Sequence, residues 1–325
     1  MTVDAGPIQA TSLSLTPLAN HNVLTTDDLD EARASVGRSL CPHRLRATGS
    51  VVRAVHNVTT LGECGFHYID YRGGAEVSTE GLPFILVQIP IAGHCVISAQ
   101  GDDRIVGVGQ AVITPTAVPL RMTYGYDNPR LMIRIDAAAW AARAEPFTAA
   151  TEVNASVVLD LTSGAGHTWR TLLDLTLAEG NDPTHDARFV ASLSSAVVDG
   201  LLAACRTNSD HASTRARVTP RRLRNALEIV ESRCAEPLTV AEIAASAGLS
   251  VRELQGAFRI HLDTTPTAHV RRVRLDRARA DLTSGTVEHV TDAATRWGFA
   301  HLGRFSRDYR VRYGETPSQT LRRHR

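Results

Sequence analysis

The chain has 325 residues, of which 43% are hydrophobic and 21% are charged; this composition is typical of a soluble globular protein and excludes disorder or a fibrous repeat over most of the length. The length favours two domains or one large domain. No apolar run approaches the roughly 18 residues that a membrane span requires, and the N-terminus lacks the pattern of a secretory signal, so we expect a cytoplasmic protein without membrane association. The five cysteines form no C-x-x-C pair, so we expect neither a disulfide framework nor a zinc site.

Charge is distributed unevenly along the chain. The first 207 residues hold 14 arginines against 21 acidic residues, a net charge of −7, whereas residues 208–325 hold 21 arginines against 13 acidic residues, a net charge of +8. The chain contains no lysine, so each fixed cation is a guanidinium, which suits phosphate groups and guanine edges. The basic tail is therefore a candidate for nucleic-acid binding, although genome composition can also produce an arginine bias.

The N-terminal residues predict a loose arm followed by a helix. Residues 1–20 are rich in Ser, Thr, Ala and Pro, which is typical of a loose arm. Thr26 followed by DDLDEARASVGRSL predicts a capped helix. The apolar face of this helix consists of Leu29, Ala32, Val36 and Leu40.

Short β-type runs broken by Gly, Pro and Asp follow, and their spacing predicts a β-sandwich or a small barrel at about residues 45–136. The predicted strands are VVRAV (51–55), FHYIDY (66–71), FILVQIPI (84–91), HCVISA (94–99), RIVGV (104–108) and LMIRI (131–135). The turn Gly101-Asp102-Asp103 indicates a hairpin. Both alternating sets of FILVQIPI are apolar, so this strand is expected to be buried on both faces, and which set would line a cavity stays open.

Helical periodicity begins after residue 136. The predicted helices are AAAWAARAE (137–145), HTWRTLLDLTLAEG (167–180) and ARFVASLSSAVVDGLLAAC (187–205). The last helix carries an apolar stripe that would face a core or a partner subunit, so we expect a homodimer. That stripe consists of Phe189, Leu193, Val197 and Leu201. The polar, aperiodic segment 207–220 predicts a linker.

Two capping boxes lie eleven residues apart in the tail, Thr239-Val-Ala-Glu242 and Ser250-Val-Arg-Glu253. Gly248 between them suits the positive φ that ends a first helix. The expected core positions are Val240, Ile243 and Ala244 on the first helix and Leu254, Ala257 and Phe258 on the second. This is the helix-turn-helix pattern, in which the second helix enters a DNA major groove.

The second half of the tail repeats this pattern. Glu242–Gly248 aligns with Asp292–Gly298 at an offset of 50, and Thr265-Pro266 aligns with Thr316-Pro317 at an offset of 51. A second recognition helix is expected at about 302–313. Leu302, Phe305 and Tyr309 would face inward on it, and Trp297 would belong to the core. AHVRRVRLDRARADL (268–282) predicts one continuous helix as a rigid spacer between the units.

Residues 222–325 resemble the tandem helix-turn-helix domain of the AraC/XylS family of bacterial transcription regulators. The matching stretches are LTVAEIAASAGLSVRELQGAF, RVRLDRARADL and VTDAATRWGFAHLGRFSRDYRVRYGETPSQTLR. Residues 24–145 resemble the family's cupin-like sensor domain, through the first helix, the VQIPIAGHCVISAQG hairpin and the passage LMIRIDAAAWAAR. The resemblance implies an α+β two-domain chain. Its parts would be a cupin-like β-barrel with flanking helices (1–206), a linker (207–220) and an all-α DNA-binding domain (221–325).

The resemblance also implies a function: binding of double-stranded promoter DNA as a transcriptional activator, with RNA polymerase as a partner and a small organic effector in the barrel. No cofactor, metal or catalytic residue is expected. The recognition helices at about 251–261 and 302–313 would present the DNA-reading side chains. The candidate DNA-binding residues are Arg252, Gln255, Arg259, Arg304, Ser306, Arg307 and Arg310.

Three positions depart from the family pattern. Gly256 stands where the family usually has Arg, which removes a DNA contact and costs roughly 1 kcal/mol of helix propensity. Asp263 replaces the glycine that ends the first recognition helix, and His289 replaces the cap that Thr239 provides in the first unit. The spacer arginines are expected to be solvated or paired with Asp276 and Asp281 rather than to read sequence. These are Arg271, Arg272, Arg274, Arg277 and Arg279.

Other readings remain open. A cupin-type enzyme fused to a DNA-binding tail would need a catalytic constellation, and the sequence shows no metal triad, nucleophile elbow or phosphate loop. His56, His67 and His94 form no H-x-H pair, which favours satisfied or surface histidines over metal ligands. Cys64 and Cys95 have no flanking cation cluster and are expected to be unreactive. An architectural DNA binder would leave the acidic N-terminal domain unexplained, and a filled barrel used only for dimerisation is the alternative to a sensor.

Overall fold

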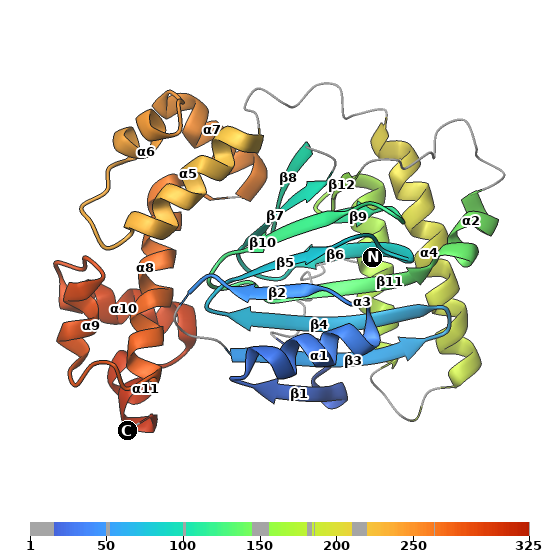
Figure 1. Cartoon of the computed structure of the whole chain (residues 1–325), viewed down its shortest axis with the longest axis horizontal. Coiled ribbons are helices and arrows are strands. Elements are labelled where there is room, and N and C mark those ends of the chain that lie inside the picture. Colours follow the sequence, from blue (N-terminus) through green and yellow to red (C-terminus); the bar gives the residue numbers. More distant parts are fainter. Residues whose placement is uncertain are drawn as a thin grey trace, which may run out of the picture.

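The computed structural model describes residues 16–49, 53–99, 102–144, 156–180, 184, 186–209, 220–262 and 264–324. Figure 1 shows a β-rich N-terminal domain, with α3 and α4 along one side of its sheets and the C-terminal helices gathered at one end. The expected α+β organisation, a β-rich domain with flanking helices followed by an all-helical domain, is confirmed.

The strands of the described residues form two antiparallel sheets. The larger sheet has the order β1 (Asn22–Thr26), β3 (Arg53–Leu61), β4 (Cys64–Arg72), β11 (Arg130–Asp136), β6 (Phe84–Pro90), β9 (Gln110–Thr114), β12 (Val157–Asp160). The smaller sheet has the order β2 (Arg44–Ala47), β5 (Ala75–Thr79), β10 (Leu120–Tyr124), β7 (His94–Ala99), β8 (Asp102–Gly107). The sequence predictions missed β1, β2, β5, β9, β10 and β12, which are only four or five residues long.

Strand β6 is buried along its whole length, as its double apolar pattern predicted. Ile85, Val87 and Ile89 belong to a core between the larger sheet and helices α3 and α4. Phe84 and Leu86 belong to a second core between the two sheets. The predicted hairpin is also present, since β7 pairs with β8 from His94↔Gly107 to Ala99↔Asp102; the turn residues 100–101 lie outside the described residues.

Helices flank the sheets much as expected. They are α1 (Leu29–Ser39), α2 (Ala137–Ala144), α3 (Gly164–Gly180) and α4 (Ala187–Ser209). The cap of α1 is Asp28 rather than Thr26, because the Asp28 carboxylate accepts from the backbone N–H groups of Asp30 at 2.7 Å and Glu31 at 3.0 Å. Helix α4 continues to Ser209, three residues into the segment expected to be a linker.

The apolar stripe expected on α4 is split between core and surface. Val197 and Leu201 are fully buried against the rest of the N-terminal domain, whereas Phe189 is 51% exposed. Residues 187–207 are long and apolar enough to cross a membrane by composition, but Val197, Val198, Leu201 and Leu202 belong to the α3–α4 core. The stripe is therefore chiefly an internal packing surface, and only its N-terminal end is available to a partner.

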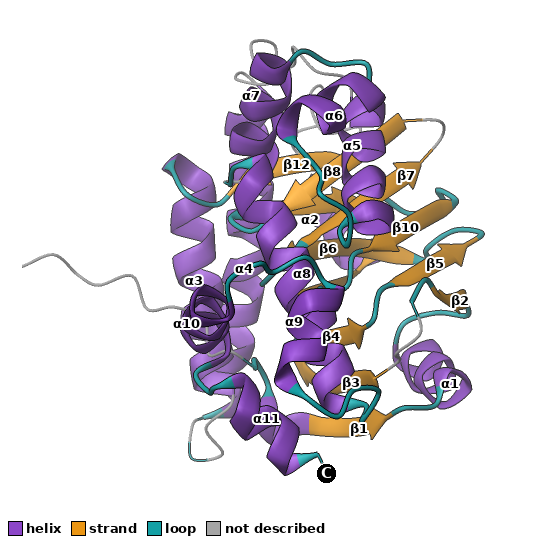
Figure 2. Cartoon of the chain, turned by 90° about the vertical axis from the view of Figure 1, so that its left-hand side faces the viewer, coloured by secondary structure: helices purple, strands orange, loops and turns teal. Residues whose placement is uncertain are grey.

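Seven helices make up the described C-terminal domain. They are α5 (Pro220–Arg233), α6 (Val240–Ser246), α7 (Val251–Leu262), α8 (Pro266–Thr283), α9 (Val290–Arg296), α10 (Leu302–Tyr313) and α11 (Pro317–Arg323). Figure 2 shows α5–α7 and α9–α11 at opposite ends of α8. Each group has its own hydrophobic core. The expected continuous spacer helix is confirmed as α8.

Candidate nucleic-acid interface

The first helix-turn-helix unit is built from α6 and α7. Thr239 caps α6: its hydroxyl accepts from the Glu242 N–H at 3.2 Å, and its own N–H donates to the Glu242 carboxylate at 2.8 Å. Ser250 and Glu253 make the same reciprocal pair at the start of α7, at 3.2 and 2.8 Å. Gly248 has φ +67° in the turn between them. Both capping boxes and the glycine turn are thus confirmed, and they fix the angle at which α7 leaves α6.

Helix α7 presents one apolar face and one polar face. Leu254, Ala257 and Phe258 are buried, as expected. Arg252, Gln255 and Arg259 are exposed on the other side of the helix. Helix α7 continues without a break through Gly256. Apart from the adjoining residues of the helix itself, no atom lies within 4 Å of the position that a Cβ at residue 256 would take. Asp263, which follows this helix, lies outside the described residues.

The second unit, α9 and α10, repeats the design with a different cap. The Asp292 carboxylate accepts from the His289 backbone N–H at 3.2 Å, so α9 keeps half of a capping box where His289 replaces threonine. Gly298 has φ +73°. Phe305 and Tyr309 are fully buried, but Leu302 is 43% exposed, so its predicted inward placement is wrong. Leu302 is the first residue of α10. This end of the helix lies outside the core that Phe305 and Tyr309 enter.

The exposed side of α10 carries the other candidate DNA-binding residues. Arg304, Arg307 and Arg310 are exposed and Ser306 is half-buried. Sequence reasoning missed Asp308, whose carboxylate lies 3.9 Å from Arg304 Nε and 3.6 Å from Arg307 Nε. Its i,i+4 spacing from Arg304 was the available signal. The carboxylate restrains both guanidinium groups on the surface while leaving them 56% and 72% exposed.

Four of the spacer arginines have partners other than those predicted, and the fifth, Arg274, bonds backbone carbonyls. Arg271 lies 3.7 Å from Asp308, Arg277 bonds Glu231 at 3.3 Å, and Arg279 bonds Glu315 at 3.3 Å. Arg272 Nη2 lies 2.9 Å from His269 Nδ1. The expected acceptors are occupied elsewhere: Asp276 pairs with Arg312 and Asp281 with Arg296. Asp276 and Asp281 point toward the second unit because α8 packs against α9–α11 on that side.

The β10–β11 loop (residues 125–129) joins the barrel to the C-terminal domain. Its Asp127 bonds Arg312 of α10 at 2.5 Å. The Tyr126 ring lies 5.0 Å from the Arg277 guanidinium of α8. Close by, Val96 and Ile105 of the smaller sheet join the core of the first helix-turn-helix unit. The two domains therefore share apolar and charged contacts.

Buried ionisable groups mark this domain junction. The ring of His94 on β7 lies tilted against that of His269 on α8, with ring centroids 5.5 Å apart. Burial, together with the nearby charge of Arg272, lowers the pKa of His94 to about 3. Burial raises the pKa of Asp276 to about 6 with a contribution from Asp127, although Arg312 opposes the shift. Neutral histidines at this junction suit a contact between the domains that forms near neutral pH.

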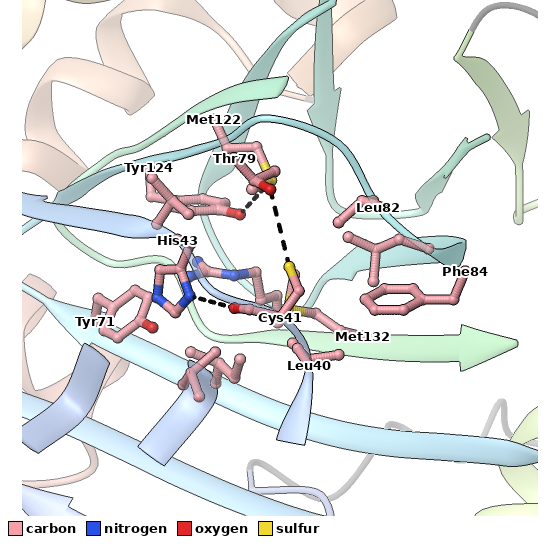
Figure 3. A pocket seen from close by; sticks show the side chains of 15 residues that line it. Leu40, Cys41, His43, Tyr71, Thr79, Leu82, Phe84, Met122, Tyr124 and Met132 are labelled. Atoms are coloured by element: carbon pink, nitrogen blue, oxygen red, sulfur yellow. Dashed lines mark hydrogen bonds between the residues drawn. The ribbon is translucent and has the colours of Figure 1, made fainter. Parts of the chain in front are cut away.

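A small apolar cavity lies between the two sheets (Figure 3). Its volume is about 30 Å³, and its lining includes Leu82, Phe84, Met122 and Met132. Helix α1 and the residues after it close one side through Val36, Leu40, Cys41 and His43, which lie outside the predicted barrel limits. A cavity that holds benzene measures roughly 150 Å³, so an organic ligand could enter only if lining side chains moved.

Polar groups are few in this cavity but distinctive. Arg130 is 2% exposed, its guanidinium carbon lies 3.3 Å from the centre of the Tyr124 ring, and its Nη1 bonds the Asn128 side chain at 2.6 Å. Arg130 Nε and His43 Nε2 are buried without a hydrogen-bond partner among the described residues. Figure 3 shows His43 next to Cys41, whose carbonyl lies 2.9 Å from His43 Nδ1.

The barrel histidines are not grouped for metal binding. His56 and His67 stack with ring centroids 5.6 Å apart, and the hydroxyl of Ser35 lies 2.9 Å from His56 Nδ1. Across the part of the chain that the structure describes, no three His, Cys, Asp or Glu side chains come together as a metal site would require. Burial raises the pKa of Cys64 to about 11 and that of Cys95 to about 12, which suppresses the reactive thiolate form.

Two family models match this chain. The AraC-binding-like domain matches residues 32–205, which is more than half of the chain, and a helix-turn-helix domain matches residues 243–323. The first match begins within α1, covers every strand of the two sheets except β1, and ends within α4, and the second begins in α6 and ends in α11.

Known relatives extend over nearly the whole chain. The probable thc operon regulatory protein of Rhodococcus erythropolis is 29% identical over 91% of this chain and 94% of its own length. The XylDLEGF operon transcriptional activator 3 of Pseudomonas putida is 25% identical over 82% of this chain and 81% of its own. The solved structure of a probable AraC family transcriptional regulator from Rhodopseudomonas palustris shares 39% identity over 32% of this chain and 97% of that one, with a TM-score of 0.31. That of the AraC-like transcriptional activator CuxR shares 17% identity over 79% of this chain and 95% of that one, with a TM-score of 0.45. With an AraC-binding-like domain and a helix-turn-helix domain both matched, the chain belongs to the AraC/XylS family of transcriptional regulators.

Proposed function

We propose that the protein regulates transcription by reading promoter DNA with both recognition helices, α7 and α10. The observation that carries this proposal is the exposure of polar and cationic side chains on the face of each helix opposite its buried face. The exposed side chains are Arg252, Gln255, Arg259, Arg304, Arg307 and Arg310, and the half-buried Ser306 lies among them on α10. Arginine is suited to guanine edges and phosphate oxygens, and glutamine to adenine.

DNA binding of this kind must depend on salt, because each Arg–phosphate contact releases counterions. The test is the affinity of the full chain for promoter fragments from its own genome between about 50 and 200 mM salt. Affinity should fall by about a hundredfold or more over this range. An affinity indifferent to salt, or equal affinity for every sequence, would contradict DNA reading by these helices.

The direction of regulation is activation. The Pseudomonas putida relatives are called transcriptional activators, and we infer that the protein contacts RNA polymerase at the promoter. Transcription in vitro from a bound promoter, with and without the protein, tests this proposal. A decrease in transcript on addition of the protein would indicate repression instead.

The N-terminal domain binds a small organic effector in the cavity between the sheets. Its apolar lining and the unpartnered Arg130 Nε and His43 Nε2 support this role, since buried polar atoms without partners are costly. The small volume implies that the ligand-bound barrel is wider than this one, so a ligand would shift the barrel between two arrangements. A dimerisation barrel without a ligand is the alternative, and thermal shift with metabolites of the neighbouring operons separates the two.

The contacts of the β10–β11 loop link the cavity between the sheets to recognition helix α10. Arg130 bonds Asn128 in this loop, and the neighbouring Asp127 bonds Arg312 of α10. A ligand that displaced Arg130 would therefore disturb the loop that also holds α10. The coupling can be no larger than the difference in ligand affinity between the two arrangements.

A further inference from the structure

The two helix-turn-helix units are joined by one arginine side chain at the middle of α8. Arg274 Nε donates to the Cys234 carbonyl at 2.7 Å, and its Nη2 donates to the Glu236 carbonyl at 2.6 Å. Both acceptors lie in the turn between α5 and α6, within the α5–α7 group that contains the first unit. Arg274 Nη1 donates to the Gly298 carbonyl of the second unit at 3.2 Å. One guanidinium group thus holds the backbone of both units.

The turn at Gly298 packs closely against the Arg274 guanidinium and its carbonyl acceptors, which we call the Arg274 clasp. A Cβ at Gly298 would stand 3.1 Å from Arg274 Cζ and 3.2 Å from the Ala235 carbonyl oxygen. Gly248 occupies the equivalent turn of the first unit with nearly the same φ, +67° against +73°, yet no atom lies within 4 Å of its Cβ position. The close approach is therefore a property of the junction rather than of the turn.

The rest of the contact between the two helix-turn-helix units is less tightly packed. Trp297 packs against the cores of both units, and its Nε1 donates to Asp281 of α8 at 2.9 Å. Beside it lies a cavity of about 220 Å³, lined by residues of both units that include Val240, Val270, Phe299 and His301. Because a hollow separates the two units here, the charge-assisted hydrogen bonds of Arg274 help to set their relative orientation.

We propose that Arg274 is a positioning residue that sets the spacing and rotational phase of the two DNA segments read by α7 and α10. This inference rests on the proposed function, in which both helices read DNA. One base pair inserted between the segments moves one of them by about 3.4 Å and rotates it by roughly 35°. A junction locked by Arg274 cannot follow such a change, so affinity should depend sharply on spacing.

The test begins with DNA selected from random duplexes by the full-length protein. The Kd is then measured for the selected site and for versions with one base pair inserted or deleted between its two segments. The wild-type protein should lose about a hundredfold in affinity on either change. Arg274→Met should reduce that penalty to about tenfold or less, and Arg274→Lys, which keeps the charge and can keep one carbonyl contact, should lie between them.

The matched control is Arg279→Met, on the same helix. Arg279 contacts Glu315 and the Tyr313 ring, both in the second unit, so this variant should keep the wild-type spacing penalty. A second, independent pair is Gly298→Ala and Gly248→Ala, which meet the same backbone penalty at equivalent turns. Only Gly298→Ala should change the spacing preference, and circular dichroism should show both variants folded.

Several outcomes would overturn the assignment. A folded Arg274→Met protein that keeps the wild-type spacing penalty would show that other contacts set the spacing. Equal loss of affinity at every spacing would show that Arg274 only supports folding. Selection of a site with a single conserved segment would contradict reading by both helices, and hence the proposed function as well, whereas the first two results would leave that function intact.

Discussion

Arg312, near the end of recognition helix α10, donates from Nη2 to the Asp127 carboxylate of the β10–β11 loop at 2.5 Å and from Nε to the Asp276 carboxylate of α8 at 2.8 Å. The same guanidinium therefore belongs to the second DNA-reading unit and to its contact with the barrel. Burial of Arg312 would lower its pKa, but the carboxylates of Asp276 and Asp127, together with Tyr313, raise it instead. A movement of the loop would consequently displace a hydrogen-bond partner of α10.

Replacing Asp127 by Asn should loosen this contact between the domains. The Asp127 side chain is 30% exposed and that of Arg312 is 23% exposed, so we expect the variant to lose about 1–2 kcal/mol of docking free energy. Hydrogen exchange should become faster in α8 and α10. Asp174→Asn, which breaks the Arg170–Asp174 pair within α3, is the control and should leave exchange in α10 unchanged. Unchanged exchange in Asp127→Asn would show that the apolar contacts alone hold the domains.

The two recognition helices should contribute unequally to specificity. Helix α7 has the half-buried Gly256, which has no side chain to contact DNA, whereas α10 keeps Arg304 and Arg307 close to Asp308. Arg307→Ala should relax sequence preference more than Arg252→Ala, with about 1–3 kcal/mol lost for each base contact removed. Competition binding on single-base variants of the selected site measures both. Equal losses, or no loss at Arg307, would reverse this ranking.

The stacked histidines of the barrel should make its stability depend on pH. Burial lowers the pKa of His56 to about 4 and that of His67 to about 3, from an ordinary value of 6.5. The unfolded chain therefore binds more protons below pH 6.5, so the stability due to the neutral rings is complete above pH 6.5 and is lost as pH falls toward 4. At pH 5.5, about one unit below the ordinary pKa, each ring should lower the free energy of unfolding by about 1.4 kcal/mol.

Denaturant unfolding at pH 7.5 and 5.5 checks this expectation. His56→Gln should show a smaller loss between the two values than the wild-type protein. The control is His301→Gln, which replaces an exposed ring at the start of α10. This variant should lose as much free energy of unfolding between the two pH values as the wild-type protein. An identical loss in His56→Gln would mean that other groups govern the acid sensitivity.

We also expect a homodimer through the outer faces of α3 and α4. Leu175 of α3 is 45% exposed and Phe189 of α4 is 51% exposed, and the two helices pack against each other. Phe189→Glu should shift the sedimenting species from dimer to monomer, because a charge would be buried in an apolar contact. Val23→Glu alters a similarly exposed residue on strand β1 and should stay dimeric. A wild-type protein that sediments as a monomer at tens of micromolar would refute the dimer.

Local patterns were sufficient to predict the DNA-reading units. Capping residues such as Thr239 and Ser250, the glycine turns and the apolar spacing of α7 act within about ten residues, so the sequence determines them without reference to the rest of the chain. The same holds for α8 and for strand β6, whose two apolar sets lie in two different cores.

Contacts between distant residues could not be predicted in this way. The short strands β2, β5 and β10 carry weak patterns, and they are strands because neighbouring strands satisfy their backbone hydrogen bonds. Three sets of contacts join segments far apart in the chain. They are the ion pairs of Arg271, Arg277 and Arg279, the clasp of Arg274 across residues 234, 236 and 298, and the Asp127–Arg312 pair across 185 positions. The sequence by itself determined that this protein carries two helix-turn-helix units beside a β-rich domain. Only the tertiary structure decided how those units are held to each other and to the barrel, because an ion pair or a carbonyl contact depends on which groups packing brings within about 3 Å.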